Sequence, residues 1–254
     1  MAKKKYKTGL VLSGGGARGF AHLGAIQALH EAGIYPDVIS GVSAGAIVGA
    51  FYAYGMSPED TLDLLKEKGL FDYSKFNFPL NGLLSLKGLI KEVKDNIPCE
   101  DISELSKPAF FAATNLNKGT IEYHNKGNLC NVVAASACIP ILFSPIEVDG
   151  ALYIDGGTFD NLPVTPIMND CEQIIAINIS PIRPVKELNS MLQIAARVFQ
   201  LSVNATVVKS LDHCDLVIAP DQLADYSILD SSVADEVYKI GYEEAKKELS
   251  KLST

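Results

Sequence analysis

Gly41-Val42-Ser43-Ala44-Gly45 places one serine between two glycines. The run 37–40 before it has the length of a short buried strand, and the apolar run 46–53 after it has the length of a helix. Ser43 therefore lies at a strand-to-helix bend, where glycines avoid the clash that a Cβ would cause. A bend of this kind leaves a serine hydroxyl projecting close to a helix N-terminus, which is the geometry of a nucleophile.

A second glycine-rich loop precedes this bend along the chain. An apolar strand over 9–12 runs into Ser13-Gly14-Gly15-Gly16-Ala17-Arg18-Gly19-Phe20, and a helix is expected from there to residue 32. Backbone N–H groups of successive glycines converge on an anion, and both the helix dipole and the Arg18 cation add positive potential. The loop therefore predicts a site for an oxyanion or a phosphate.

Composition limits the class of protein. A chain of 254 residues with 48% hydrophobic and 20% charged residues can bury a large core, so we expect one domain over 1–254. The net charge of −8, with no compensating basic stripe, argues against a nucleic-acid partner. Five scattered cysteines without a CxxC pair favour reduced thiols and a cytoplasmic location. Four histidines without ligand spacing predict no metal.

Strands and helices alternate along most of the chain, which is typical of an α/β domain built on a largely parallel sheet. The segment Ser57-Pro58-Glu59-Asp60 has the capping residues of a helix start, and Asp149-Gly150 is typical of a type I′ hairpin. The other expected elements are strands over 108–116, 120–124, 173–179 and 215–219 and helices over 128–138, 186–211 and 232–252.

The first glycine loop allows a dinucleotide-binding alternative, because Gly14 to Gly19 satisfies GxGxxG between a strand and a helix. In that fold an acidic residue closes the second strand, whereas here Asp37 precedes the strand and Ser43 follows it. The two glycine-flanked turns follow successive strands and should meet at one sheet edge. One turn would supply a nucleophile and the other N–H donors for a developing oxyanion, which indicates acyl transfer.

The partner of Ser43 has two candidates. Asp155-Gly156-Gly157 follows a strand and leaves a carboxylate unobstructed. His213 completes the order Ser43, Asp155, His213 of the α/β-hydrolases, although its place at the end of a long helix is also that of a C-cap. The residues alone leave open a Ser-Asp pair and a Ser-His-Asp triad.

GGGARG, GVSAG and DGG, in this order and followed by Asn161-Leu162-Pro163, resemble the patatin-like phospholipase family, including its bacterial single-domain members. The resemblance covers roughly residues 9 to 180. It implies a three-layer α/β/α sandwich with a mostly parallel central sheet. It also implies that Ser43 is the nucleophile and Asp155 its partner, without histidine, in an elbow flanked by Gly41 and Gly45. The residues that would border the oxyanion hole are Gly14, Gly15, Gly16 and Arg18.

The resemblance implies a serine acyl hydrolase acting on lipid esters, phospholipids or lysophospholipids, with no metal or organic cofactor. A solvated aspartate with a pKa of about 3.9 is a weak base, so Asp155 is expected to be buried. Two further interpretations stay open: the chain could be a nucleotide-binding protein or a catalytically silent one.

Residues 69–90 are rich in Leu, Phe and Gly, and we expect them to cover the core, to line an acyl pocket or to form a lid. We expect the helix over 186–211 to cover the core rather than to anchor in lipid. No integral membrane segment is expected, and peripheral membrane contact stays open.

Overall fold

The structure is a computed structural model that describes residues 4–68, 86–185 and 187–252. Most of the segment expected to line a pocket or form a lid, 69–85, lies outside the described residues. The strands are β1 (Tyr6–Leu12), β2 (Val38–Val42), β3 (Ala109–Asn115), β4 (Thr120–His124), β5 (Ile146–Val148), β6 (Ala151–Asp155), β7 (Cys171–Ile177) and β8 (Leu216–Ile218). The helices are α1 (Phe20–Glu31), α2 (Ala44–Tyr54), α3 (Pro58–Lys68), α4 (Lys87–Asn96), α5 (Leu129–Ser136), α6 (Met191–Leu211) and α7 (Ala234–Leu252).

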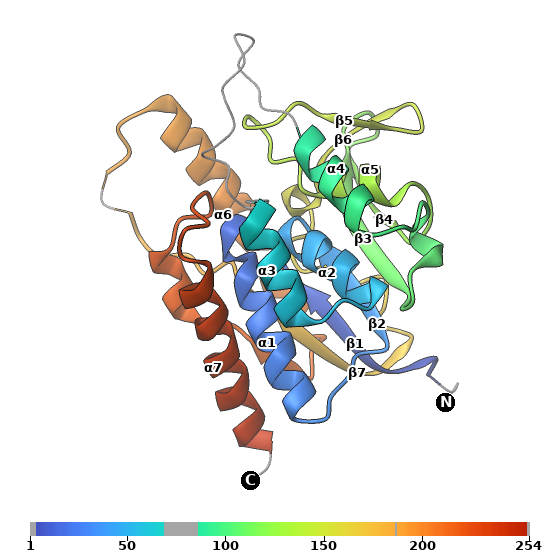
Figure 1. Ribbon diagram of the computed structural model, residues 1–254. Coiled ribbons are helices and arrows are strands. Elements are labelled where there is room, and N and C mark those ends of the chain that lie inside the picture. Colours follow the sequence, from blue (N-terminus) through green and yellow to red (C-terminus); the bar gives the residue numbers. More distant parts are fainter. Residues whose placement is uncertain (1–3, 69–85, 186, 253–254) are drawn as a thin grey trace.

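The strands form one sheet in the order β5-β6-β3-β2-β1-β7-β8, with β4 paired to β3 (Figure 1). The pairs β1–β2, β1–β7, β2–β3 and β7–β8 are parallel, as expected. The pairs β3–β4, β3–β6 and β5–β6 are antiparallel. The expected hairpin is present, because Asp149 and Gly150 both have positive φ, 49° and 78°.

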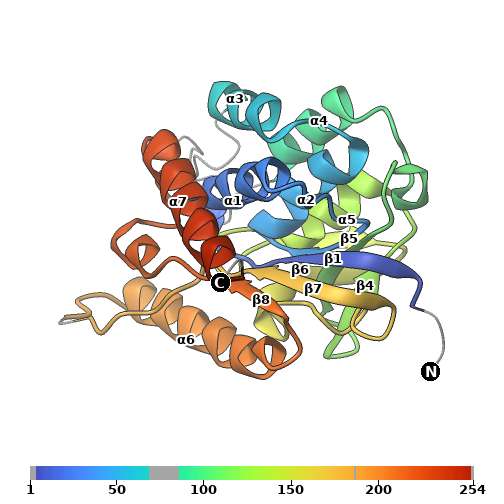
Figure 2. The ribbon, with the colours of Figure 1, turned by 90° about the horizontal axis from the view of Figure 1, so that it is seen from below.

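Helices cover the two faces of the sheet unequally, as Figure 2 shows. The helices α1 to α5 and α7 lie over one face and bury a large core, while α6 lies on the opposite face. A second core forms under α6, where Val11 and Ala176 of the sheet and Val207 of α6 are buried together. The predicted three-layer arrangement is confirmed.

The long helix begins later than expected. Ser190 accepts a hydrogen bond from the backbone N–H of Gln193, so α6 starts at Met191 rather than at 186. It covers the core with Val203 and Val207, as expected, but its outer face carries exposed apolar side chains. The sequence did not predict α4, whose Leu89 and Val93 are buried. Among the described residues, none of the helices is both long and apolar enough to cross a membrane.

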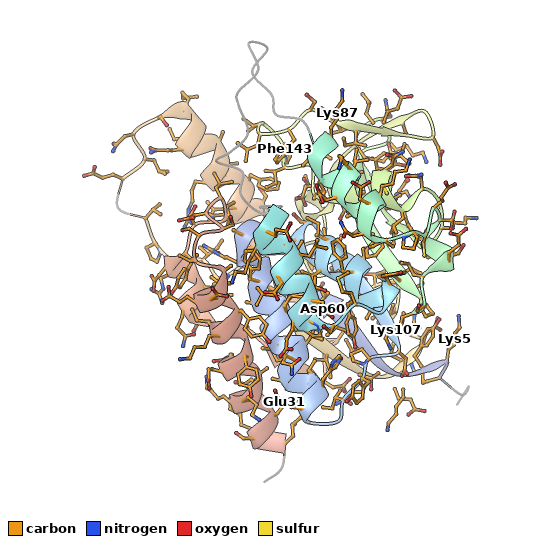
Figure 3. The ribbon with its side chains drawn as sticks, viewed as in Figure 1. Lys5, Glu31, Asp60, Lys87, Lys107 and Phe143 are labelled. Atoms are coloured by element: carbon orange, nitrogen blue, oxygen red, sulfur yellow. The ribbon has the colours of Figure 1, made fainter. Side chains whose placement is uncertain are left out.

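Two glycines let α1 and α7 pack at very short distance. A Cβ at Gly241 of α7 would lie 2.0 Å from the Ala21 carbonyl oxygen, and one at Gly24 of α1 would lie 2.0 Å from that of Tyr238. At the end of α1, Glu31 (Figure 3) accepts a 2.7 Å hydrogen bond from the Tyr242 hydroxyl of α7. The C-terminal helix is therefore held against the helix that follows the glycine loop.

We expect Gly241→Ala to lower the free energy of unfolding by about 1–3 kcal/mol, because the added methyl group has no space and α7 must move away from α1. Chemical denaturation measures the change. Glu243→Ala, on the exposed side of α7, is the matched control and should change stability by less than about 0.5 kcal/mol. Equal midpoints for Gly241→Ala and the wild type would contradict this packing.

Candidate active site

Ser43 follows β2 at a strained bend. Its φ of 54° and ψ of −122° are unusual for a residue with a side chain, and α2 begins at the next position. The flanking glycines are needed because a Cβ at Gly45 would lie 2.2 Å from the Leu12 carbonyl oxygen, and one at Gly41 would lie 2.5 Å from that of Gly45. The bend therefore forms only where these two positions lack side chains.

The backbone of Ser43 is held from a second element. Its N–H donates to the Ser136 hydroxyl oxygen at 3.0 Å, and that hydroxyl donates to the Ala112 carbonyl oxygen of β3 at 2.6 Å. Ser136 is fully buried at the end of α5. It thus ties the bend to β3, since without it two buried backbone groups would lose a partner.

β3 brings Asp155 to Ser43. Val42, the last residue of β2, pairs with Ala112, while Asp155, the last residue of β6, pairs with Ala113. Because β4 occupies the other side of β3 at both positions, β2 and β6 follow one another along the same side. The two strands therefore end against consecutive β3 residues, and this brings the Ser43 hydroxyl near enough to the Asp155 carboxyl group to favour its charged form.

Burial changes the acidity of Asp155, whose exposed fraction is 2%. Desolvation raises its pKa from 3.8 to about 6, while the nearby Ser43 hydroxyl and the hydrogen bond from the Gly157 N–H oppose the rise. The Gly157 bond is 2.8 Å long. Asp155 is consequently a stronger proton acceptor than an exposed aspartate, which is what attack by an alcohol requires.

The glycine loop lies beside this pair, because β1 ends opposite Gly41 of β2. A Cβ at Gly14 would lie 3.1 Å from the Ser43 Cβ. Within the described part of the chain, the N–H groups of Gly14, Gly15 and Gly16 have no hydrogen-bond acceptor. These donors are available to a ligand.

Two buried side chains hold the loop from the other side. His22 Nε2 lies 2.8 Å from the Ser13 carbonyl oxygen, and Ser180 donates to the Gly14 carbonyl oxygen. In a trans peptide the C=O and the following N–H point in opposite directions. The N–H groups of Gly14 and Gly15 therefore point away from His22 and Ser180. Burial lowers the pKa of His22 to about 4, so His22 is neutral and donates.

Arg18 is buried at the same loop. Its guanidinium donates to the Tyr226 carbonyl oxygen at 2.8 and 3.0 Å and to that of Pro181 at 3.4 Å. Desolvation lowers its pKa to about 10, which still leaves it charged at neutral pH. Arg18 therefore adds positive potential and fixes two loops, and its Nε, Nη1 and Nη2 groups donate to these carbonyl oxygens.

These residues share one small cavity of about 40 Å³ at the carboxyl edge of β1, β2 and β7. Every residue that the sequence placed at the nucleophile and the oxyanion hole lines it: Ser43, Asp155, Gly14, Gly15, Gly16 and Arg18. A larger apolar groove adjoins it and shares Arg18, Ile139, Phe199, Gln200 and Ile228 with it. Ester substrates with an apolar chain would fit this combination.

His213, which the triad alternative requires, and Asp37, the acid beside the second strand, both lie away from the cavity. His213 is exposed ahead of the amino end of β8, whereas Ser43 follows the carboxyl end of the parallel strand β2, so they occupy opposite sheet edges. Asp37 also lies at the amino edge, where its carboxylate accepts from the N–H groups of Lys7 and Thr8 at 3.0 and 2.9 Å. Neither residue lines the cavity.

Sequence reasoning assigned no role to Asn161 or Ser180. Asn161 is 1% exposed, lines the cavity and donates from its side-chain amide to the Ser180 hydroxyl at 3.1 Å. Ser180 follows β7 at the carboxyl edge, a position that could have identified it. Among residues 4–68, 86–185 and 187–252, the structure has no group of three or more His, Cys, Asp or Glu side chains that could hold a metal ion.

Comparison with known proteins gives the family. The model of the family "Patatin-like phospholipase" matches residues 10–168. A lysophospholipase of Neosartorya fischeri is 29% identical over 97% of this chain and 18% of its own length. An uncharacterised NTE family protein of Mycobacterium bovis is 32% identical over 77% of this chain and 58% of its own. The chain thus spans about a fifth of the length of the first relative and somewhat over half of the length of the second.

Among solved structures, VipD from Legionella pneumophila matches with a TM-score of 0.57 and 16% identity, over 97% of this chain and 67% of that chain. This likeness concerns the fold, and it agrees with the mixed sheet and its two helical layers. The family match spans both glycine-flanked turns and Asp155. The chain belongs to the patatin-like phospholipase family.

Proposed function

We propose that this chain is a serine acyl hydrolase that cleaves carboxylic esters of lipids, namely phospholipids or lysophospholipids, through a Ser43–Asp155 dyad. The observation that carries the proposal is the meeting of Ser43 and the buried Asp155 in one cavity, beside three glycine N–H groups that have no acceptor among the described residues. The family and the lysophospholipase relative support a lipid ester as substrate.

In the acylation step, Asp155 takes the Ser43 proton while the Ser43 Oγ attacks the ester carbonyl carbon. The carbonyl oxygen becomes negative, and the N–H groups of Gly14, Gly15 and Gly16 stabilise it, with Arg18 adding positive potential. The tetrahedral intermediate then expels the alcohol, which receives the proton held by Asp155. The fatty acyl group is left on Ser43.

Deacylation repeats these steps with water. Asp155 removes a proton from water, the resulting hydroxide equivalent attacks the acyl carbon, and the same N–H groups hold the second oxyanion. Collapse breaks the bond to the Ser43 Oγ, which regains its proton from Asp155, and the fatty acid leaves. These steps use no metal or organic cofactor.

Residues 1–254 would form one catalytic domain. We propose a cytoplasmic location, because the five cysteines are free thiols and scattered thiols of this kind suit a reducing compartment. Peripheral contact with a membrane would give the enzyme access to lipid esters.

We expect Ser43→Ala and Asp155→Asn each to lower kcat by at least about 10³-fold on a soluble short-chain ester, because both remove a member of the reacting pair. Steady-state kinetics measure the loss, and circular dichroism checks the fold. Asp160→Asn is the matched control, since Asp160 is a nearby buried acid that contacts Tyr123 and does not line the cavity. Retained turnover in Asp155→Asn would refute the dyad.

We expect His213→Ala to keep wild-type kinetics, because His213 lies at the opposite edge of the sheet. If the enzyme used His213 in a triad, His213→Ala would instead lower kcat by several orders of magnitude. Labelling by a fluorophosphonate gives a second reading: the wild type and His213→Ala should be labelled and Ser43→Ala should not. An unlabelled wild type would favour a catalytically silent protein.

We expect kcat/KM to decline as the pH falls through about 6, because protonated Asp155 cannot accept the Ser43 proton. The measurement is a pH–rate profile on a soluble ester from about pH 5 to about pH 8, with stability checked at each end. His22, with a pKa of about 4, and Arg18, with a pKa of about 10, should not titrate in this range. A flat profile across it would argue against Asp155 as the base.

A further inference from the structure

The outer face of α6 carries an unusual apolar stripe. Its first four members recur at a spacing of three or four residues, and the fifth follows seven residues later on the same side. All five are exposed: Met191 80%, Ile194 40%, Val198 57%, Leu201 48% and Val208 64%. Surface helices ordinarily turn such a stripe toward the core. Here Val203 and Val207 already supply the buried side, so the helix is apolar on two faces. Exposed apolar patches of this kind mark interaction surfaces.

The stripe is continuous with the rim of the apolar groove. Val185 and Leu188 line the groove, are 52% and 40% exposed, and lead directly into the start of α6. Across the groove, Ile141 is 49% exposed and has a φ of 75°, a strained value for a β-branched residue. The rim and the stripe therefore form one exposed apolar surface beside the opening toward Ser43.

Charge favours one occupant of this surface, because the two cations of α6 outnumber Glu187, the one acidic residue among the described residues that line the groove. In a chain of net charge −8, the charged residues of α6 are Arg197 and Lys209, and the helix has no acidic residue. Arg197 donates to the Arg183 carbonyl oxygen at 2.8 Å, while Lys209 is exposed. An apolar stripe with cations beside it fits a helix that lies in the surface of a bilayer with anionic headgroups.

We propose that the outer face of α6 and the rim formed by Ile141, Val185 and Leu188 dock on an anionic lipid bilayer. Docking would place the groove against the bilayer, so an acyl chain could pass from lipid into the groove without crossing water. This direction of entry rests on the proposed function, whereas the docking surface itself rests on exposure and charge. A second copy of the chain on this face would cover the mouth of the groove.

The test is co-sedimentation of the full chain, carrying Ser43→Ala to prevent hydrolysis, with vesicles of phosphatidylcholine alone or mixed with phosphatidylglycerol. We expect stronger binding to the mixed vesicles. Val198→Asp and Leu201→Asp should each weaken binding by about tenfold or more, because each puts a charge into the apolar contact. Lys209→Gln should weaken binding to mixed vesicles alone, by about fivefold.

Tyr35→Asp is the matched control, because Tyr35 is 61% exposed at the opposite sheet edge, and it should bind as strongly as the parent. With Ser43 present, Val198→Asp and Leu201→Asp should hydrolyse a soluble ester at the wild-type rate, since neither residue lines the cavity or the groove. Equal binding by parent and α6 variants would overturn the proposal. A parent dimer that the α6 variants dissociate would also overturn it, in favour of a second copy as occupant.

The two proposals fail separately. If the protein binds vesicles through α6 but hydrolyses no ester, the docking proposal stands and the hydrolase proposal is refuted. If it hydrolyses esters in a Ser43-dependent way but binds no vesicles, the hydrolase proposal stands and the docking proposal is refuted.

Discussion

The pairing of two strands with one side of β3 is the constraint on which the site depends. β2 ends opposite Ala112 and β6 ends opposite Ala113, so register alone brings Ser43 and Asp155 together from distant parts of the chain. The parallel pairing of β2 with β3 places Ser43 at the carboxyl edge of the sheet, and the antiparallel pairing of β6 with β3 brings Asp155 to the same edge. Ser136 adds a hydrogen-bonded link between Ala112 and Ser43. A shift of one residue in either register would separate hydroxyl and carboxyl groups.

Burial raises the proton affinity of Asp155, as its proposed role as a base requires, and at the same time destabilises the fold. Its pKa is about 6 in the folded chain and near 3.8 when exposed, so the folded state binds this proton more tightly. Stability therefore falls as pH rises through the window between the two values, and at neutral pH the buried carboxylate costs roughly 3 kcal/mol. Close packing elsewhere, such as the glycine contacts of α1 with α7, offsets this loss.

Local signals predicted the elements that carry the site, because glycines, caps and apolar runs act over a few residues. The bend at Ser43, the loop at Gly14 and the hairpin at Asp149 are all of this kind. Contacts that depend on distant segments left no such signal. The pairing of β6 beside β2, the bond from Ser180 to Gly14 and the link through Ser136 each require the fold itself. Strand order at the carboxyl edge was the only available guide to them.

The two faces of the sheet differ in the cover that they receive, and this difference bears on function. The helices α1 to α5 and α7 bury one face, whereas α6 and the segment 160–170 cover the other around a smaller core. A single helix on a face must turn one side to solvent, and ordinary selection for solubility would make that side polar. In α6 it stays apolar on the helix whose Phe199 and Val203 line the Ser43 cavity. The thin layer thus combines a wall of the candidate site with the exposed apolar face that we propose as the docking surface.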